Sequence, residues 1–301
     1  MLQRNETLTS IAKTIEVSVS TVSREIRRNS TKKGVYNDDI ASHKAQKRKS
    51  LTHGGHTIPP GVYIRVLNLI RQHRWSPEQI SGRLKREGVL VSKSAIYNYI
   101  NKIPKGRKND IRNYMRHGGK SLKKGRKAGK IVIPDRVSIE DRPDSACGNV
   151  VGDWEMDTII GKNGKGVILT LVDRKSLYLI MAKVKTGKKS IPMAYIVVNT
   201  LRNSKLPVRT ITTDNGLEFA GHKIIAKELN TTVYFAHPYS SWEKGTIENM
   251  NGIIRQYIPK GTDFKKITNK QIRSIMEEIN NRPRKKNKYE TPKEIIQNRN
   301  Y

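Results

Sequence analysis

Two stretches near the N-terminus share one pattern of apolar positions. The apolar side chains of residues 8–29 are Ile11, Ile15, Val17, Val22 and Ile26, and those of residues 76–101 are Ile80, Leu84, Val91, Ile96 and Ile100. Their spacing predicts two helices joined by a turn in each stretch. A serine near the start of each second helix supplies a plausible N-cap. The pattern therefore predicts two helix-turn-helix units.

The second helix of each unit is predicted to expose groups that suit phosphates and base edges. In the first unit, these DNA-binding candidates are Ser20, Thr21, Ser23, Arg24, Arg27 and Arg28. In the second unit, they are Lys93, Ser94, Tyr97 and Asn98. A helical hairpin with a merely solvated basic face is the competing interpretation, and finding the pattern twice favours DNA binding.

The two units differ in what precedes them. An amphipathic helix is predicted at 61–73 before the second unit, whereas only MLQRNET stands before Leu8. Because a helix-turn-helix normally packs against a preceding helix, we expect an N-terminally shortened chain whose first unit lacks that helix. Residues 1–30 would then be marginally stable, and recognition of DNA ends would depend more on 76–101 than on 8–29.

From about residue 146 the pattern changes to apolar runs typical of strands. Strands are predicted at 150–160, 166–173, 177–184, 208–214 and 232–236, and helices at 188–203, 217–229, 245–257 and 268–281. The three early strands, joined by short turns, should be antiparallel, and the later strands, which alternate with helices, should be parallel. The predicted fold class is α/β, with a mixed sheet covered by helices on both faces.

Composition indicates a polyanionic partner. The 301 residues include 59 Lys and Arg against 26 Asp and Glu, a formal net charge of +33. Such an excess is best explained by double-stranded DNA. Residues 44–50 and 101–130 are predicted linkers, the second with 12 basic residues and one acid, which would lie along phosphates.

One cysteine, Cys147, excludes an internal disulfide and a cysteine-based zinc module. No apolar run reaches the length of about 18 residues that a membrane span needs, and the start lacks a signal-peptide core. We therefore expect a cytoplasmic protein that has no membrane partner.

Three acidic positions suggest metal chemistry. Asp157 lies on the first strand, where Asp153 and Glu155 share its face by period two. Asp214 closes the fourth strand, and Glu248 borders the apolar stripe of a later helix. Phosphodiester chemistry uses two Mg²⁺ ions about 3.5–4 Å apart, held by carboxylates. Mn²⁺ is an expected substitute. Each acid alone has a plain structural alternative, a turn former at Asp214 or a solvated helix residue at Glu248, and any of the three strand acids could serve.

Several blocks, in order, carry a resemblance. They are WSPEQISGRL, PDRVSIEDRP, GDWEMDTIIG, LVDRKS, TTDNGLEFAGH, VYFAHPYSSWEKGTIENMNGIIRQYIPKGTDF and INNRPRKK with YETP. Together they resemble the insertion sequence thirty family of bacterial transposases over nearly the whole chain. The resemblance implies a ribonuclease-H-like integrase core, an Asp-Asp-Glu triad at Asp157, Asp214 and Glu248, and recognition of the terminal inverted repeats of a mobile element.

The domains expected from pattern and resemblance together are four. Residues 1–50 and 58–104 form the helix-turn-helix units, 105–145 a basic linker, and 146–301 the catalytic domain. Such a transposase would cleave element ends and join them to target DNA in the bacterial nucleoid. It would act as a homo-oligomer assembled on DNA.

The sequence departs from the family pattern at His237, Ser241 and Ile247, and none of these is a metal ligand. Around Glu248, stacking on a DNA end is expected from Tyr239 or Trp242. The full set of expected contacts to DNA ends is His237, Tyr239, Trp242, Lys244, Asn249, Asn251 and Arg255. That the aromatic rings cover the core instead is equally compatible with the sequence.

Three other functions remain open. A DNA-binding regulator would need no acidic triad, a structure-selective nuclease would cut without joining, and a degenerate element copy would be inactive. A retroviral-type integrase is disfavoured because its His-Cys zinc module is absent.

Overall fold

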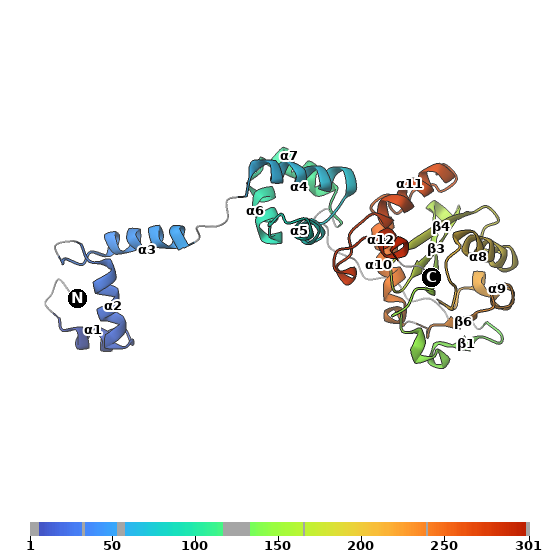
Figure 1. Cartoon of the computed structure of the whole chain (residues 1–301), viewed down its shortest axis with the longest axis horizontal. Coiled ribbons are helices and arrows are strands. Elements are labelled where there is room, and N and C mark those ends of the chain that lie inside the picture. Colours follow the sequence, from blue (N-terminus) through green and yellow to red (C-terminus); the bar gives the residue numbers. More distant parts are fainter. Residues whose placement is uncertain are drawn as a thin grey trace. The chain divides into compact units, whose positions relative to one another are not determined.

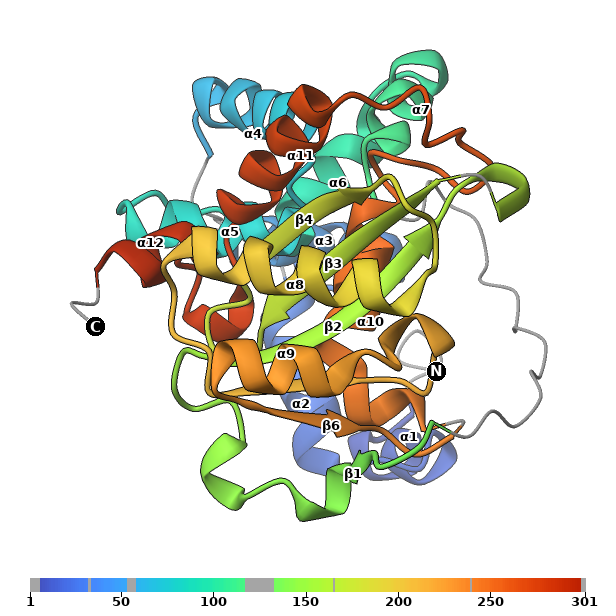
Figure 2. The same ribbon diagram turned by 90° about the vertical axis from the view of Figure 1, so that its right-hand side faces the viewer.

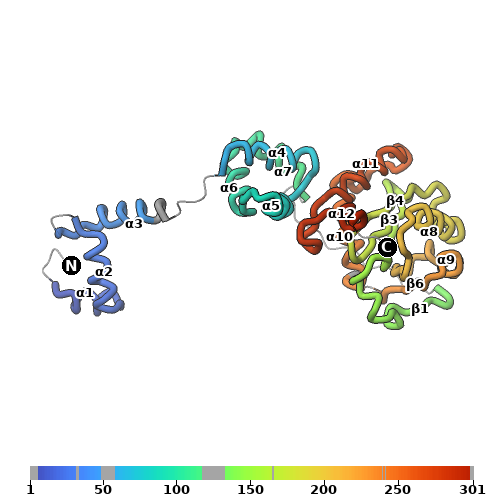
Figure 3. The backbone as a smooth tube through the Cα atoms, in the orientation of Figure 1, coloured from blue at the N-terminus to red at the C-terminus, as the bar shows by residue number. Residues whose placement is uncertain are grey.

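The computed structural model describes residues 6–31, 34–52, 58–116, 133–164, 166–238 and 240–298, without the side chains of 49–52 and 241. They form two compact units, Met1–Pro59 and Pro60–Tyr301, each described by itself. Figures 1 and 3 label the elements and trace the backbone. Residues 117–132 of the predicted basic linker and the expected DNA contact Tyr239 lie outside the described residues.

The first unit is helical and has a small core. Its helices are α1 (Leu8–Thr14), α2 (Val19–Asn29) and α3 (Asp38–Thr52). The side chain of Ser18 caps α2 by accepting the Thr21 N–H. The buried cluster consists of Ile11, Ala12 and Val22. Its two consecutive helices match the predicted helix-turn-helix.

The helix α3 corrects one prediction, because residues 44–50 were expected to be a linker. Ala41 is buried, and the Lys44 ammonium donates to the Ser30 carbonyl at 2.5 Å. Composition alone did not predict this helix, because α3 has few apolar residues of its own and is stabilised by contacts with α2, which the local sequence does not reveal.

The second unit begins with four helices, α4 (Pro60–His73), α5 (Pro77–Arg86), α6 (Lys93–Lys102) and α7 (Lys105–Asn113). A capping box between Ser76 and Gln79 begins α5, with Pro77 in its first turn. Buried side chains from all four helices form the core: Val66, Ile70, Ile80, Leu84, Ile96, Ile100 and Ile111. The predicted second helix-turn-helix, with its preceding helix, is confirmed.

The helix α7 and a short strand both fall in the predicted linker 105–145. Ile111 of α7 is 1% exposed, and α7 contacts α4 and α6. The strand β1 (Val137–Ser138) pairs in parallel with β6 (Thr232–Phe235). The predicted linker was therefore too long at both ends. A helix with one buried isoleucine and a strand of two residues hardly change the basic, polar composition from which the linker was predicted.

A six-stranded sheet organises the rest of the unit, in the order β1-β6-β5-β2-β3-β4. Its other strands are β2 (Asp153–Ile160), β3 (Val167–Asp173), β4 (Leu179–Val184) and β5 (Thr210–Thr213). The pairs β2–β3 and β3–β4 are antiparallel, whereas β5 is parallel to β2 and to β6. The predicted mixed pairing is confirmed.

Helices cover both faces of this sheet. One face packs Trp154 and Met156 against α8 (Ser190–Ser204) and α9 (His222–Leu229), and Figure 2 shows these two helices crossing it. The other face packs Ile159 against α10 (Gly245–Ile254) and α11 (Asn269–Asn280). Alternation along β2 thus assigns its even positions to one helical layer and its odd positions to the other.

Short elements complete the unit. The 3₁₀ turns are Ile139–Asp141, Asp144–Ala146, Lys162–Gly164, η5 (Leu217–Phe219), η6 (Ser241–Lys244) and Lys285–Asn287, and the last helix is α12 (Pro292–Gln297). Helices formed by the described residues do not reach the length and apolar character that crossing a bilayer requires.

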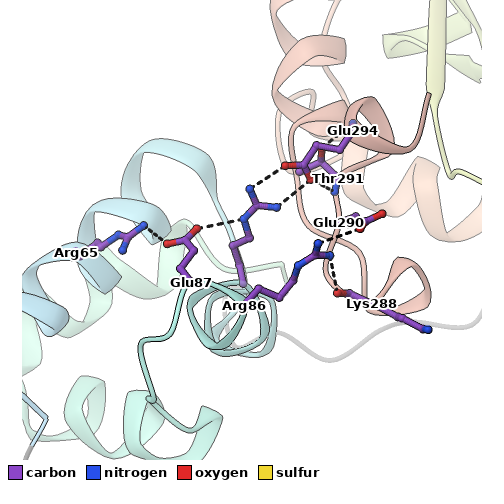
Figure 4. A network of polar contacts seen from close by, with 8 residues as sticks. Arg65, Arg86, Glu87, Lys288, Glu290, Thr291 and Glu294 are labelled. Atoms are coloured by element: carbon purple, nitrogen blue, oxygen red, sulfur yellow. Dashed lines mark hydrogen bonds and ion pairs between the residues drawn. The ribbon is translucent and has the colours of Figure 1, made fainter. Parts of the chain in front are cut away.

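The second helix-turn-helix docks on the C-terminal segment through ion pairs (Figure 4). The Arg83 guanidinium donates to both oxygens of Glu294, at 2.9 and 2.8 Å. Arg86 pairs with Glu290 at 2.9 Å and donates to the Lys288 carbonyl at 3.1 Å. Next to these pairs, Gly82 faces the ring of Tyr289, where a Cβ would lie 2.3 Å from ring carbons. Only glycine therefore fits on this side of α5 without displacing the tyrosine.

The Arg83–Glu294 pair should make docking dependent on pH. Hydrogen bonding to Arg83 lowers the pKa of Glu294 from 4.5 to about 2. Because this folded-state pKa is depressed, the stabilisation is complete above pH 4.5 and is lost as the pH falls toward 2. Glu294→Gln should reduce the free energy of unfolding at pH 7 by up to about 1 kcal/mol, since both side chains remain partly exposed. Urea unfolding at several pH values should show this difference shrinking below pH 4.5, and a constant difference would contradict the assignment.

The small core of the first unit predicts a difference in local stability. Ile15, Val17 and Val19 are each at least 40% exposed, so α1 and α2 bury few apolar groups. In amide exchange of the full chain, residues 9–28 should exchange orders of magnitude faster than β2 and β3, which lie in the sheet core. Protection across 9–28 equal to that of β3 would show that this unit is stable with the contacts it has.

Candidate active site

The sheet places Asp157 beside Asp214. In the parallel pair β2–β5, Asp153 lies opposite Thr210 and Glu155 opposite Thr212. Two residues further in the same register, Asp157 comes level with Asp214, which directly follows β5. Neighbouring strands lie about 4.8 Å apart, so two carboxylates meet at this point of the sheet.

Lys244 provides the counter-charge for both aspartates. Its ammonium lies 3.1 Å from Asp214 Oδ2, and the residue is only 6% exposed. Burial raises the pKa of Asp157 to about 6, the charge of Lys244 opposes this rise, and Asp214 and Glu218 add to it. The site is therefore a region of negative charge in which Asp214 is partly exposed, and Lys244 offsets only part of this charge.

The other strand acids have structural partners. Asp153 is fully buried and accepts hydrogen bonds from Thr210 Oγ1 at 2.9 Å and the Gly148 N–H at 3.3 Å. Glu155 accepts the Ile247 N–H of α10 at 2.8 Å and pairs with Arg174 at 3.3 Å. Both are engaged in holding the fold, whereas the hydrogen bonds of Asp157 come from its chain neighbour Thr158 and from Asn251 of α10.

Glu155 also fixes the helix that carries the third acid. Ile247 is the third residue of α10, whose first N–H groups have no partner within the helix. A carboxylate at this end satisfies one of them and interacts favourably with the helix dipole. The contact anchors the start of α10 on the strand that carries Asp157.

Glu248 lies on the same face of α10 as Asn251, three residues further along the helix. Lys244, four residues earlier, contacts Asp214, and Asn251, three residues later, donates from Nδ2 to Asp157 Oδ2 at 2.8 Å. Residues spaced by four and three share one helix face. Glu248 is exposed between these two contacts.

The three predicted acids do not form a single group of metal ligands in the structure. Within the described part of the chain, His, Cys, Asp and Glu side chains nowhere gather in a group of three or more that could hold a metal ion. Asp157 and Asp214 are brought together, and Glu248 approaches from α10 without joining them. Lys244 supplies the positive charge in this arrangement.

Sequence reasoning missed Glu218 in η5. It is 7% exposed, accepts a hydrogen bond from Thr158 Oγ1 at 2.9 Å, and pairs with Lys188 at 2.7 Å. A Cβ on Gly216 would lie 2.9 Å from Glu218 and 3.0 Å from Asp214. Burial opposes ionisation, but the Lys188 ammonium lowers the pKa of Glu218. Its position in DNGLEF, next to a core phenylalanine, was the available signal.

The expected DNA contacts differ in exposure. All candidates on α2 and α6 are exposed: Ser20, Thr21, Ser23, Arg24, Arg27, Arg28, Lys93, Ser94, Tyr97 and Asn98. Trp242 is 75% exposed, which excludes the alternative that it covers the core. Arg255 is half-buried, donates to the Ile160 carbonyl at 3.2 Å and lies over the Phe264 ring. It is thus held beside the site by the fold.

Comparisons with known proteins give full-length relatives. The transposase for insertion sequence element IS4351 of Bacteroides fragilis is 46% identical over 299 residues, covering 98% of this chain and 91% of that protein. The transposase for IS1086 of Cupriavidus metallidurans is 32% identical and covers 96% and 88%. Transposase InsI for IS30A of Escherichia coli is 32% identical and covers 98% and 80%.

Two further comparisons add less. No family model matches the sequence. Among solved structures, the catalytic core domain of BIV integrase is similar at 18% identity and a TM-score of 0.37, covering 48% of this chain and 93% of that one.

Proposed function

Because the chain belongs to the IS30 family of insertion-sequence transposases, we propose that it cleaves and joins DNA with Asp157, Asp214 and Glu248. The observation that carries this proposal is the register that sets Asp157 level with Asp214, with α10 anchored above them by Glu155. The substrate would be the terminal inverted repeats of the element, followed by target DNA.

The residues of the site fit a divalent metal. Carboxylate oxygens are the ligands that Mg²⁺ prefers, and the two aspartates have more negative charge than Lys244 alone offsets. Asp157, Asp214 and Glu248 would hold the ions. When bound, two Mg²⁺ ions neutralise charge on the attacking and leaving oxygens of the phosphodiester.

The side chains around the triad have positioning tasks. Asn251 holds one oxygen of Asp157, and the Thr158 N–H holds the other at 2.8 Å, so the carboxylate has a fixed orientation. The Lys244 ammonium opposes the rise that burial causes in the pKa of Asp157, and it pairs with Asp214 at 3.1 Å. Glu218 and its partner Lys188 support the loop that follows Asp214.

DNA binding is assigned to the two helix-turn-helix units and to exposed groups near the site. The exposed faces of α2 and α6 offer hydroxyl, amide and guanidinium donors for phosphates and base edges. Trp242 offers an exposed ring on which an unpaired base at a DNA end can stack. The net charge of +33 supplies attraction to any DNA.

The test is purified full chain with DNA that carries the element ends and Mg²⁺, scored separately for cleavage and for strand joining. Cleavage followed by joining supports the proposal, and EDTA should abolish both. Cleavage without joining would favour the structure-selective nuclease. Binding without either reaction, in the presence of Mg²⁺ or Mn²⁺, would leave a DNA-binding regulator or an inactive copy.

A further inference from the structure

A basic cavity lies on the other side of α10 from the acidic site. It has a volume of about 300 Å³, and its lining comes from the α4–α5 turn, from Arg116, from α10 and from the segment after α11. Its charged lining residues are Arg74, Glu78, Arg116, Arg282, Arg284, Lys285 and Lys286. Six cations thus face a single acid, Glu78, which itself pairs with Lys285 at 3.1 Å.

Two of these arginines are buried and only partly satisfied. Arg282 and Arg284 are 3% and 5% exposed. Arg282 donates to Gln256 Oε1 at 2.8 Å and Arg284 to the Ile279 carbonyl at 3.1 Å. The Nε atom of each has no hydrogen-bond partner among the described residues. Burial, together with the neighbouring charges of Arg282 and Arg116, lowers the pKa of Arg284 to about 9.

The other two arginines of the cavity, Arg74 and Arg116, are held in its lining by hydrogen bonds to backbone carbonyls. Arg74, at the end of α4, has a left-handed φ of 54° and donates to the Gln256 carbonyl. Its guanidinium lies over the Tyr257 ring, 4.8 Å from the centroid. Arg116 donates to the Asn249 carbonyl at 3.4 Å and lies against Gly252, where a Cβ would come within 2.9 Å of it.

This arrangement is unfavourable without an anion. Buried charges that lack a partner of opposite sign destabilise a fold, and buried donors normally find an acceptor. Neighbouring guanidiniums here repel one another, because no carboxylate in the cavity lining pairs with them. Guanidinium groups bind phosphate oxygens through parallel N–H donors, so the shared chemistry of the missing ligand is a phosphate group.

We propose that this cavity binds one phosphate of the DNA backbone and thereby fixes the strand relative to α10. The choice of DNA as the source rests on the proposed function, whereas the binding of a phosphate group does not. Asn249 in the lining is adjacent to Glu248 in the chain. A phosphate held here sets the position of the strand along the helix that carries the third acid.

The test uses full chain and a DNA duplex in which single backbone phosphates are replaced, one at a time, by neutral methylphosphonates. Affinity is measured in EDTA, so that no cleavage occurs. For the unsubstituted protein, one phosphate position should weaken binding about tenfold or more when neutralised, as expected for hydrogen bonds to a charged group. In Arg116→Gln, the affinity for unmodified DNA should fall by a similar factor, and neutralising that position should have little further effect.

The matched control is Arg202→Gln. Arg202 is an exposed arginine on α8, which covers the opposite face of the sheet, and it pairs with Glu228. This variant should keep the full methylphosphonate effect at the same position. Arg116 is exposed, so its replacement should leave the fold intact. Arg284→Lys serves as a second variant that keeps the charge but loses the paired donors.

Two outcomes overturn the proposal. A scan in which Arg116→Gln retains the effect at every sensitive position would show that no backbone phosphate uses this cavity. If the scan is insensitive to Arg116 while inorganic phosphate raises the unfolding temperature of the unsubstituted protein, and not of Arg116→Gln, the ligand is a free anion. Because the scan measures binding alone, a failure of DNA cleavage would count against the proposed function and leave this result readable.

Discussion

Asp157→Asn, Asp214→Asn and Glu248→Gln are each expected to abolish cleavage of element-end DNA while leaving DNA binding nearly intact. Each substitution keeps the size of the side chain and removes the negative charge that holds a divalent metal. The loss should be at least about 10³-fold, as for removal of one member of a catalytic group that acts as a unit. The measurement is single-turnover cleavage at saturating DNA, together with affinity in EDTA.

The matched control is Asp144→Asn, an exposed acid in the turn Asp144–Ala146 outside the site. It should cleave at the rate of the unsubstituted protein. Chelation by EDTA should reproduce the triad variants, and adding Mg²⁺ or Mn²⁺ in excess should reverse it. Full cleavage by Glu248→Gln would remove α10 from the catalytic assignment.

Glu155→Ala is expected to cost about 3 kcal/mol or more of the free energy of unfolding, because it breaks a buried charge pair from one side. It leaves the Arg174 guanidinium without its carboxylate and the Ile247 N–H at the start of α10 without an acceptor. Cleavage should fall as well, since Glu248 and Asn251 depend on the placement of α10. Urea unfolding and cleavage at a temperature where the variant is folded are the two measurements.

Glu155→Gln separates the two effects of this carboxylate. The amide oxygen can still accept the Ile247 N–H, so α10 should stay in place and more activity should survive than in Glu155→Ala. Equal urea midpoints for Glu155→Ala and the unsubstituted protein would mean that α10 is held by its apolar contacts alone.

Period and turn chemistry predicted the main elements of the sheet domain from sequence. Period two predicted that Glu155 and Asp157 share one face of β2, and in the structure both accept hydrogen bonds from α10. The elements that were missed depend on distant partners. The strand β1 exists only through its pairing with β6, and α7 contributes one buried residue, Ile111.

The same distinction applies to the site. The family motifs led to Asp157, Asp214 and Glu248, whereas the apolar pattern alone left the choice among the three acids of the first strand open. Lys244 and Asn251 were expected only as contacts to DNA ends. Their contacts with Asp214 and Asp157 could not be predicted, because each joins segments that are distant in the sequence. The cavity arginines were likewise unpredictable, because their segments are adjacent only in three dimensions.

The three alternating acids of β2 have a consequence for genetic screens. Asp153, Glu155 and Asp157 differ in task, since the first accepts hydrogen bonds from Gly148 and Thr210, the second anchors α10, and the third would hold metal under the proposed function. A loss-of-transposition screen would score all three as essential and suggest five catalytic acids. Protein abundance in the cell should separate them, because variants at Asp153 and Glu155 should be degraded. Asp157→Asn should instead accumulate as a stable protein. It should occupy element ends and dominantly block transposition by the unsubstituted enzyme.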